Sequence, residues 1–584
     1  MLFFARALTV VFGSFIGLGL AGVALAQTAD RPASNDVHAA VLSENAFPSA
    51  VECGACHQRI FQEWAASSHA YASISPMFHK FEQAINDLSS GTIGTFCVRC
   101  HQQVGTQRGE ARELPLWDRS PVAREGITCI TCHRVSAAFG KVNGERHIEP
   151  GSIHEPVYST GTADNLGKVL LNPEEFDVAP APGDKGRPIH VGAVAFEQVG
   201  ESEFCASCHQ VAVNLGIKLE VVWEQYRDSP AFRAGVTCQD CHMSKNPGTA
   251  SGYDAWPTAI VNGRVVGDPN RKHSNHGFSG PGYPIAHPGL FPFNPRSLRW
   301  SIKDWLAFDY RAGWGTPAFE AALTADKPTN FPAVWSKRSD REEARLVILQ
   351  NEDALREKEK ERRIAMENAS RIDGPFFDGK PPARGEDLRL RYRITNINTG
   401  HNLPSGSLGA QPEIWLNVAL IDPDGKNVWE SGYVDSNGDM ADIHSLDVAD
   451  GKIAFDTQLF NLQTKFLTTN VKGTDREMAL PVQFDIDQLP FLRPATQPTT
   501  VLNHPPFIRM EGRSIPPLGY RDANYSVPAD RLTKPGTYSL QVRLRSRAEP
   551  IYFMRFVGAT REMEQRINEM MIDIHPYAAA FEVR

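Results

Sequence analysis

All ten cysteines of this 584-residue chain fall in five Cys-x-x-Cys pairs, and a histidine directly follows every pair. The five motifs are Cys53, Cys56 and His57; Cys97, Cys100 and His101; Cys129, Cys132 and His133; Cys205, Cys208 and His209; and Cys238, Cys241 and His242. Only 18 residues of the chain are histidine, so their position behind all five pairs makes histidine part of the motif. Each motif must therefore bring two thiols and one imidazole to a common group.

Three chemistries compete for such pairs. A disulfide framework in an exported protein usually joins distant segments and gives no reason for a following histidine. Zinc ribbons use two pairs for each metal ion, so five pairs would leave one pair without a partner. Covalent attachment of haem c uses all three residues, because both thiols bind the porphyrin and the histidine binds the iron. The sequence therefore predicts five covalently bound haem c groups.

The N-terminus predicts export. Residues 1–26 contain Arg6, an apolar run and the small-x-small triplet Ala24, Leu25, Ala26, as in a secretory signal peptide that is cleaved after Ala26. A retained membrane anchor is the alternative, since the apolar run is nearly long enough to span a bilayer. We expect a periplasmic or otherwise exported protein with no transmembrane anchor after cleavage, which agrees with haem attachment outside the cytoplasm.

Composition narrows the choice of partners. The formal net charge of −8 argues against a nucleic-acid-binding protein, because such a protein needs a basic face to neutralise phosphates. Redox partner proteins, a donor and an acceptor, or small ions are expected instead. The oligomeric state is left open by the sequence.

The motif region contains an internal repeat. The second and third motifs begin 129 − 97 = 32 residues apart, and the fourth and fifth begin 238 − 205 = 33 residues apart. Matching residues surround the motifs in both copies: Phe96, Gln102, Ser120, Pro121, Arg124, Gly126 and Thr128 in the first; Phe204, Gln210, Ser229, Pro230, Arg233, Gly235 and Thr237 in the second. This pattern indicates a duplicated two-haem module with one further haem in front.

The patterns along the chain predict an α+β multidomain protein. Residues 27–295 are expected to form a mostly α-helical and irregular pentahaem cytochrome c domain whose core consists largely of the macrocycles. Residues 296–375 are expected to be helical, with a capping box at Ser339–Glu342 that opens a charged helix running to about Ser370. Alternating apolar residues at 388–394, 414–420 and 538–544, with turn signals at 422–425 and 534–536, predict an antiparallel β-sandwich in residues 376–584.

Histidines outside the motifs decide whether each iron has a second protein ligand or keeps an open coordination position. A second protein ligand makes an electron carrier, whereas an open position can bind a substrate. Thirteen histidines remain after the motif histidines are removed (18 − 5), and eight of them lie between the first motif and Pro295, which is more than five irons need. The candidate distal ligands are His69, His154, His190, His276 and His401. Met77 and Met243 are weaker candidates.

His401 differs from the other candidates because it follows the haem region by more than a hundred residues. It lies in the sequence NTGHNLPSG, between the first two strands of the predicted β domain. A loop rich in glycine, asparagine and proline can bring a side chain close to another surface. If His401 binds an iron, it joins the β domain to the haem array; otherwise it is a locally hydrogen-bonded loop residue.

The chain resembles the multihaem cytochromes c that are related to the tetrahaem cytochrome of nitrifiers, the pentahaem nitrite reductases and the octahaem hydroxylamine and tetrathionate enzymes. Segments 53–70, 124–135, 235–243, 272–278 and 400–406 carry the similarity, and the last resembles the Gly-His-x-x-Pro-x-Gly loop of a subgroup with a C-terminal β domain. The resemblance implies that His69, His190 and His276 are distal ligands and that the haems stack in close pairs. The Cys-x-x-Cys-Lys motif of many nitrite reductases is missing, which argues against nitrite reduction.

The sequence favours a periplasmic electron-transfer protein whose β domain docks a redox partner or organises assembly. One alternative is an enzyme in which four haems feed a fifth, open iron that acts on a small nitrogen or sulfur compound. Arg124 or Arg233 would then steer an anion, or would pair with haem propionates. A second alternative is a structural protein that polymerises through the sandwich. No catalytic residue is predicted.

Overall fold

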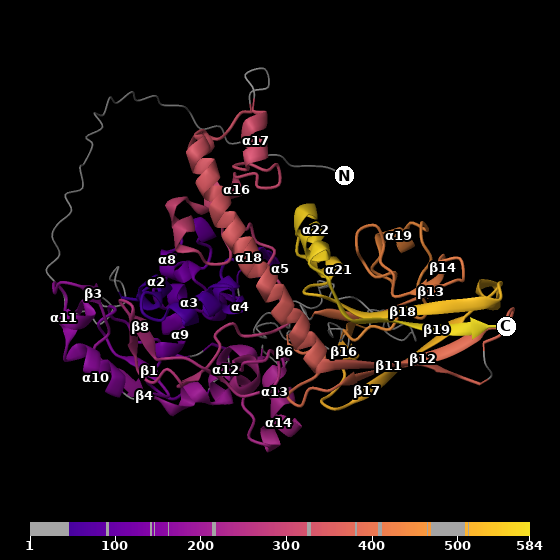
Figure 1. Cartoon of the computed structure of the whole chain (residues 1–584), viewed down its shortest axis with the longest axis horizontal. Helices are drawn as coiled ribbons and strands as arrows, with labels where there is room; N and C mark the ends of the chain where they lie inside the picture. The colour runs from indigo at the N-terminus through magenta and orange to yellow at the C-terminus, as the bar shows by residue number, and fades with distance from the viewer. Residues whose placement is uncertain are drawn as a thin grey trace, which may run out of the picture.

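The computed structural model describes residues 46–584 except 89–90, 92, 141–142, 145, 162, 213–217, 324–328, 380–381, 407–411, 464, 469–507 and 512. The predicted signal peptide, residues 1–26, lies outside the described residues. Figure 1 shows two regions, one of short helices in indigo and magenta and one of long strands in orange and yellow, with the long helix α18 between them. No helix in the described part of the chain is long and apolar enough to cross a membrane.

The motif region, up to Pro295, consists of short elements. Its helices are α2 (Ala50–Gly54), α3 (Gln58–Ala65), α4 (Ser68–Tyr71), α5 (Pro76–Leu88), α6 (Val98–His101), α7 (Gln103–Gln107), α8 (Pro121–Arg124), α9 (Cys129–His133), α10 (Asp164–Leu170), α11 (Pro173–Phe176), α12 (Ser202–His209), α13 (Val222–Arg227), α14 (Pro230–Arg233) and α15 (Cys238–His242). The first motif begins with Cys53 inside α2 and ends with His57 just before α3, and the other four motifs end α6, α9, α12 and α15. Helix geometry thus presents each of these four motif histidines at a helix C-terminus.

Two-stranded pairs link these helices. They are β1 (Val157–Ser159) with β4 (Ala193–Ala195), β2 (Val178–Ala179) with β3 (Arg187–Pro188), β5 (Val211–Ala212) with β6 (Lys218–Glu220), β7 (Asp254–Ala255) with β10 (Lys272–His273), and β8 (Ala259–Val261) with β9 (Arg264–Val266). The buried apolar residues form separate small clusters, such as Ala46, Phe47, Val104, Val122, Ile130 and Ile148. Short elements and divided clusters agree with the predicted helical and irregular domain.

The sequence repeat has the same backbone course in both copies. Helices α8 and α14 each begin with proline and are followed by a glycine with φ of 69°, Gly126 and Gly235. Thr128 and Thr237 are then the N-cap residues of the motif helices α9 and α15. A Cβ atom on Gly126 would lie 2.5 Å from the carbonyl oxygen of His69, so glycine is needed there for space as well as for its positive φ.

The segment from 296 to 375 is only partly helical. It contains η4 (Pro295–Arg299), α16 (Ile302–Leu306), α17 (Pro317–Ala322), η5 (Ala333–Trp335) and α18 (Arg338–Ala369). The predicted capping box is wrong: Lys337 is the N-cap residue of α18, and the Glu342 side chain accepts a hydrogen bond from Arg338 instead. The prediction that the helical segment continues to residue 375 is also wrong, because from Ser370 the chain forms a β-strand that pairs with a neighbouring strand.

The C-terminal region is an antiparallel sandwich, as predicted. One sheet has the order β11 (Ser370–Phe377), β12 (Leu388–Asn396), β17 (Tyr520–Val527); the other has the order β14 (Asn427–Ser431), β13 (Glu413–Ile421), β18 (Gly536–Arg547), β19 (Ile572–Val583). The alternating apolar residues of both sheets share one buried cluster, which includes Leu390, Tyr392, Leu416, Val418, Leu540 and Val542. This shared core explains why period-2 patterning identified the strands.

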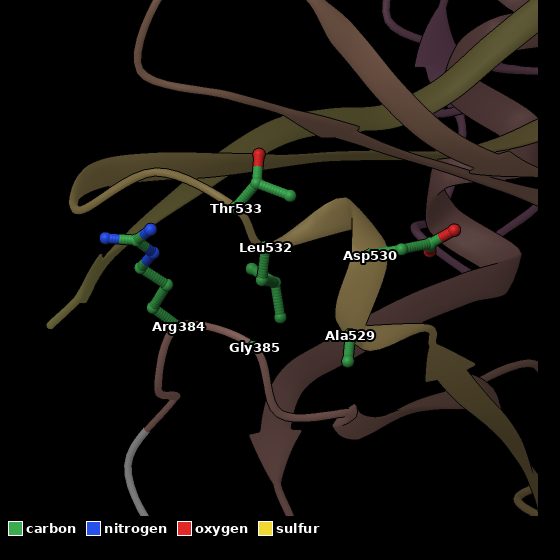
Figure 2. Close-up of a pocket in the computed structure, with 6 residues that line it drawn as sticks. All are labelled: Arg384, Gly385, Ala529, Asp530, Leu532 and Thr533. Atoms are coloured by element: carbon green, nitrogen blue, oxygen red, sulfur yellow. The ribbon is translucent and has the colours of Figure 1, made fainter.

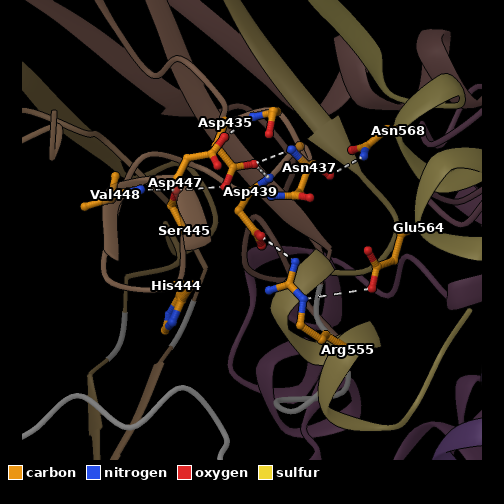
Figure 3. A network of polar contacts seen from close by, with 12 residues as sticks. Asp435, Asn437, Asp439, His444, Ser445, Asp447, Val448, Arg555, Glu564 and Asn568 are labelled. Atoms are coloured by element: carbon orange, nitrogen blue, oxygen red, sulfur yellow. Dashed lines mark hydrogen bonds and ion pairs between the residues drawn. The ribbon is translucent and has the colours of Figure 1, made fainter. Parts of the chain in front are cut away.

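Further elements cover the ends of the sandwich: the pair β15 (Lys465–Thr468) and β16 (Ile508–Glu511), and helices α19 (Leu446–Ala449), α21 (Ile551–Phe556) and α22 (Arg561–Glu569). A polar network joins α21 and α22 to the loop after β14 (Figure 3). Arg555 donates to Asp439 at 2.8 Å, and Asn568 donates to the carbonyl oxygen of Asn437 at 2.9 Å. Asp435 accepts from the backbone N–H groups of Asn437 and Asp439, so these carboxylates serve the loop fold.

Helix α18 connects the two regions physically. Lys358 donates to the carbonyl oxygen of Gly277 in the motif region at 2.6 Å, and Arg363 donates to the carbonyl oxygen of Asp573 on β19 at 3.0 Å. Asn368 donates to the carbonyl oxygen of Pro247 at 2.9 Å. The end of α18 is therefore held by both regions.

Candidate haem-binding sites

Three motif histidines each face a second histidine at nearly the same spacing. The ring centres are 6.3 Å apart for His209 and His69, 6.4 Å for His133 and His276, and 6.1 Å for His242 and His401. Two imidazoles on opposite faces of one metal ion place their ring centres about 6 Å apart, because each metal–nitrogen bond is about 2 Å long. These residues therefore fit an iron with two axial histidines.

A fourth pair consists of His57 and His190. Burial lowers the pKa of His57 to about 4, and the nearby His190 is the next largest cause. The Nδ1 atom of His190 is held 3.1 Å from the carbonyl oxygen of Gly192. The structure thus brings together, as neighbours, another motif histidine and another predicted distal ligand.

Hydrogen bonds fix the histidine rings in one orientation. Backbone carbonyl oxygens lie near Nδ1 of His57 (Thr258, 3.0 Å), His101 (Ala72, 3.2 Å), His133 (Tyr158, 2.8 Å), His242 (Ser279, 2.7 Å), His276 (Ser274, 2.8 Å) and His401 (Asn402, 3.0 Å). A histidine that binds a metal commonly donates its other ring N–H to such a partner, which sets the tautomer and leaves Nε2 for the metal. The rings are therefore prepared for ligation through Nε2.

Except for His209, the histidines of the pairs are also kept in the neutral form that binds metals. At His209 burial acts to lower the pKa, but the Glu220 carboxylate outweighs it and raises the pKa to about 9. Burial lowers the pKa of His69 to about 3 and the pKa values of His242 and His276 to about 4; a neighbouring histidine of the pair contributes in each case. A neutral imidazole offers a lone pair to a metal ion, whereas a protonated one does not.

His401 reaches the fifth motif from the β-sandwich. Its ring is nearly parallel to that of His242, with an interplanar angle of 15°. The loop that carries it docks on α13, because Gln225 Oε1 accepts from the backbone N–H of Asn402 at 3.2 Å and from the hydroxyl of Ser405 at 2.7 Å. Two domains that are far apart in sequence therefore contribute to one candidate site.

His101 has a different environment. The ring of Phe78 lies parallel to it, with the ring centres 4.1 Å apart and an interplanar angle of 9°. The nearby His79 directs Nε2 to the carbonyl oxygen of Ser73 at 2.8 Å. In the described part of the chain, no second histidine ring is paired with His101 at the axial spacing. The second motif is the candidate for an iron with an open face.

His154 is not brought against a motif histidine. Its Nδ1 lies 3.3 Å from the carbonyl oxygen of Ile189, next to His190. Two other histidines are committed elsewhere: His273 Nε2 contacts the Glu63 carboxylate at 2.8 Å, and both ring nitrogens of His287 are hydrogen-bonded. The surplus of histidines in the sequence is therefore smaller than their number suggests.

Neighbouring motifs approach one another through their cysteines. The Sγ atoms of Cys53 and Cys129, of Cys205 and Cys238, and of Cys100 and Cys208 lie within hydrogen-bonding reach. Arg146 lies beside Cys132 and Cys208, between the third and fourth motifs. The ten cysteines form no disulfide in the structure.

Glu125, which the sequence patterns did not single out, organises two motifs. Its buried carboxylate accepts from the Ser49 hydroxyl, from the backbone N–H of Ala50 at 2.9 Å and from the Thr128 hydroxyl at 2.6 Å. Burial raises the pKa of Glu125 to about 7. Because Ser49 caps α2 and Thr128 precedes α9, this carboxyl joins the helices of the first and third motifs.

Two cavities differ in their relation to the motifs. One of about 590 Å³ is lined by Cys56, His57, Arg59 and Trp256, among others, and so adjoins the first motif. The other, of about 320 Å³, lies in the β-sandwich and is lined by Arg384, Gly385, Ala529, Asp530, Leu532 and Thr533 (Figure 2). None of these six lining residues is a histidine or a cysteine, and they include no pair of carboxylates. The lining therefore does not suggest a catalytic or metal-binding site.

Comparisons with known proteins agree with the motif chemistry. Residues 52–134 match the family described as cytochrome c554 and c-prime. Among solved structures, the chain is similar to a penta-heme cytochrome c552 from Thermochromatium tepidum, with 15% identity, a TM-score of 0.47 and coverage of 92% of this chain and 98% of that chain. An alkylpurine DNA glycosylase from Pseudomonas fluorescens, bound to DNA containing an abasic site analog, matches with 11% identity, a TM-score of 0.13 and coverage of 43% and 41%.

No curated protein matches the chain in sequence. At their low identities and TM-scores the two solved structures carry no weight for function. The matched family segment, by contrast, contains the first three Cys-x-x-Cys-His motifs. The segment that contains these three motifs is therefore similar to a cytochrome c family.

Proposed function

We propose that the protein is an exported, periplasmic electron carrier that binds five haem c groups and passes electrons between two redox partner proteins. The observation that supports this most directly is the set of three histidine pairs with ring centres 6.1–6.4 Å apart. When bound, each haem c supplies a one-electron redox centre. An iron that is closed by two histidines has no face for a substrate, so most of the sites suit electron transfer.

The cysteines would hold the groups in one connected array. Sγ contacts join the first motif to the third, the fourth to the fifth and the second to the fourth. Arg146, beside Cys132 and Cys208, spans the remaining step from the third motif to the fourth. The order of neighbours in space, 1–3–4–5 with 2 beside 4, differs from the order in sequence, and it leaves no motif isolated.

The β-sandwich would serve the array through His401. In this proposal His401 is the distal ligand of the fifth motif, His69 of the fourth, His276 of the third and His190 of the first. The sequence also suggested His154 as a distal ligand. In this proposal it is not a ligand, and its role is the hydrogen bond to the carbonyl oxygen of Ile189. The sandwich thus completes one haem site besides offering a surface to partners.

Haem content and spin state test the proposal together. The purified protein is expected to carry five haems by pyridine haemochrome assay and mass spectrometry, and its oxidised electron paramagnetic resonance spectrum is expected to be dominated by low-spin signals. Replacement of His401 with alanine should convert one haem to the high-spin form. His147→Ala is the matched control, since its side chain is 65% exposed. A bare chain mass, or an unchanged spectrum for His401→Ala, would contradict the proposal.

A second candidate function rests on the second motif. In the described residues no second histidine is paired with His101 at the spacing of the other three pairs, so an iron held there would keep an open face that can bind a small molecule. The protein would then be an oxidoreductase that acts on a small nitrogen or sulfur compound. One high-spin signal that disappears when cyanide is added would favour this function, and five low-spin haems that do not respond to cyanide would exclude it.

A further inference from the structure

The five motif histidines do not share the same partner at Nδ1. In four of them the partner is a backbone carbonyl oxygen, 2.7–3.2 Å away. His209 instead faces a carboxylate: its Nδ1 atom lies 3.6 Å from Oε1 of Glu220. A full negative charge therefore stands behind one motif histidine, where the other four have only a carbonyl dipole.

A local fold brings Glu220 to this position. After the fourth motif the chain forms the antiparallel pair β5 and β6, in which Val211 is the register partner of Glu220. Because Val211 is two residues after His209, this pairing brings Glu220 back beside the fourth motif. The loop of the β-sandwich that carries His401 also approaches Glu220, because a Cβ atom on Gly406 would lie 3.9 Å from Glu220 Oε1.

A carboxylate partner changes what the histidine gives to an iron. At 3.6 Å, longer than a hydrogen bond, it acts through its charge, which attracts the Nδ1 proton and makes Nε2 a more basic ligand. A more basic ligand favours the more positively charged, oxidised metal, and second-shell hydrogen bonds are among the features that set haem potentials. The effect should be largest at the fourth motif, because no other motif histidine has a carboxylate beside Nδ1; the charge of Glu220 also reaches His101 of the second motif, but less directly.

We propose that Glu220 is a positioning residue that gives the haem held by His209 the most negative reduction potential of the array. This inference rests on the proposed electron-transfer function. The fourth motif is the one whose cysteines contact two other motifs, through Cys100 with Cys208 and through Cys205 with Cys238. The haem with the most negative reduction potential would therefore lie at the branch point of the array. It would stand between the first and third haems on one side and the fifth haem on the other.

Spectroelectrochemical titration of the holoprotein tests the assignment. Replacement of Glu220 with glutamine should shift the most negative midpoint potential in the positive direction, and by more than any other midpoint. Glu203→Gln is the matched control: it removes one carboxylate from the same motif helix, α12, but Glu203 is exposed and does not face His209. An unchanged most negative midpoint in Glu220→Gln would overturn the proposal, as would an equal shift in the control.

A second variant keeps the test decisive if Glu220→Gln binds fewer haems. Glu220→Asp retains the charge on a shorter arm and should raise the same midpoint by a smaller amount; no shift would again overturn the assignment. Haem content and spin state of the unmodified protein are measured separately. Five low-spin haems with an unshifted midpoint would refute the role of Glu220 alone, whereas absence of covalent haem would refute the proposed function itself.

Discussion

The motif region and the β-sandwich are ordered by different means. In the sandwich, β12, β13, β17, β18 and β19 contribute to one contiguous apolar cluster. In the motif region, short helices surround several small clusters, and the best-defined groupings are pairs of histidines and cysteines. The comparison indicates that apolar burial is sufficient for the sandwich, whereas the motif region depends on covalent groups that the side chains are arranged to hold.

The largest expected effect follows from removing those groups. If haem attachment is prevented, the motif region should lose its structure and the sandwich should keep its own, because only the latter has a continuous core. Limited proteolysis followed by mass spectrometry should then yield protected fragments from a region that begins near Ser370, the start of β11. Native helical circular dichroism in the haem-free protein would show that the comparison is wrong.

A core substitution tests the other half of the comparison. Leu416 on β13 is fully buried in the sandwich cluster, so Leu416→Ala should lower the free energy of unfolding of the sandwich by about 2–5 kcal/mol. Denaturant unfolding followed by tryptophan fluorescence measures this loss, and the haem absorption spectrum should not change. Leu346→Ala on α18, where the leucine is 52% exposed, is the control and should change stability by about 0.5 kcal/mol or less.

A buried carboxyl at the junction of the regions gives a pH-dependent effect. Burial raises the pKa of Glu549 to about 7, with Arg362 acting in the opposite direction, and Oε2 of Glu549 has no hydrogen-bond partner. Because the folded pKa is raised, the stability that the neutral acid provides is complete below its unfolded pKa, near 4.3, and is lost as pH rises through about 7. The full loss is roughly 3 kcal/mol.

Glu549→Gln should remove most of this pH dependence, because an amide stays neutral. Comparison of the free energy of unfolding at pH 5 and pH 8 for both proteins measures the effect. The variant should be more stable than the unmodified protein at pH 8 and similar to it at pH 5. Equal pH profiles for the two proteins would show that Glu549 does not couple the regions to pH.

The smallest effect is expected on the solvent side of α18. Arg338 and Glu342 form an ion pair at 2.8 Å, but their side chains are 62% and 43% exposed. Glu342→Ala should therefore cost only about 0.3–0.5 kcal/mol, and high salt should reduce the cost further. Thermal unfolding at low and high ionic strength measures this; a loss of several kcal/mol would mean that α18 contributes more to joining the regions than its contacts suggest.

Prediction from sequence succeeded where the signal is local. The strands predicted at 388–394, 414–420 and 538–544 lie within β12, β13 and β18. In β12 and β18 the period-2 pattern reflects one buried face, whereas β13 is buried on both faces. The expected helix end near Ser370 also agrees with α18, which ends at Ala369, but the capping box predicted at Ser339 lies inside the helix, and residues 370–375, predicted as helical, pair as a strand. Helix ends depend on competing contacts that neighbouring residues alone do not reveal.

The sequence by itself determined the chemistry of attachment, because two cysteines and a histidine act together only at their fixed spacing. It also determined the class of the C-terminal domain. The tertiary structure decided which histidines meet: His401 joins His242 across about 160 positions, Phe78 packs on His101, and Glu220 stands behind His209. Such contacts arise from the packing of distant segments, and no spacing within either segment encodes them.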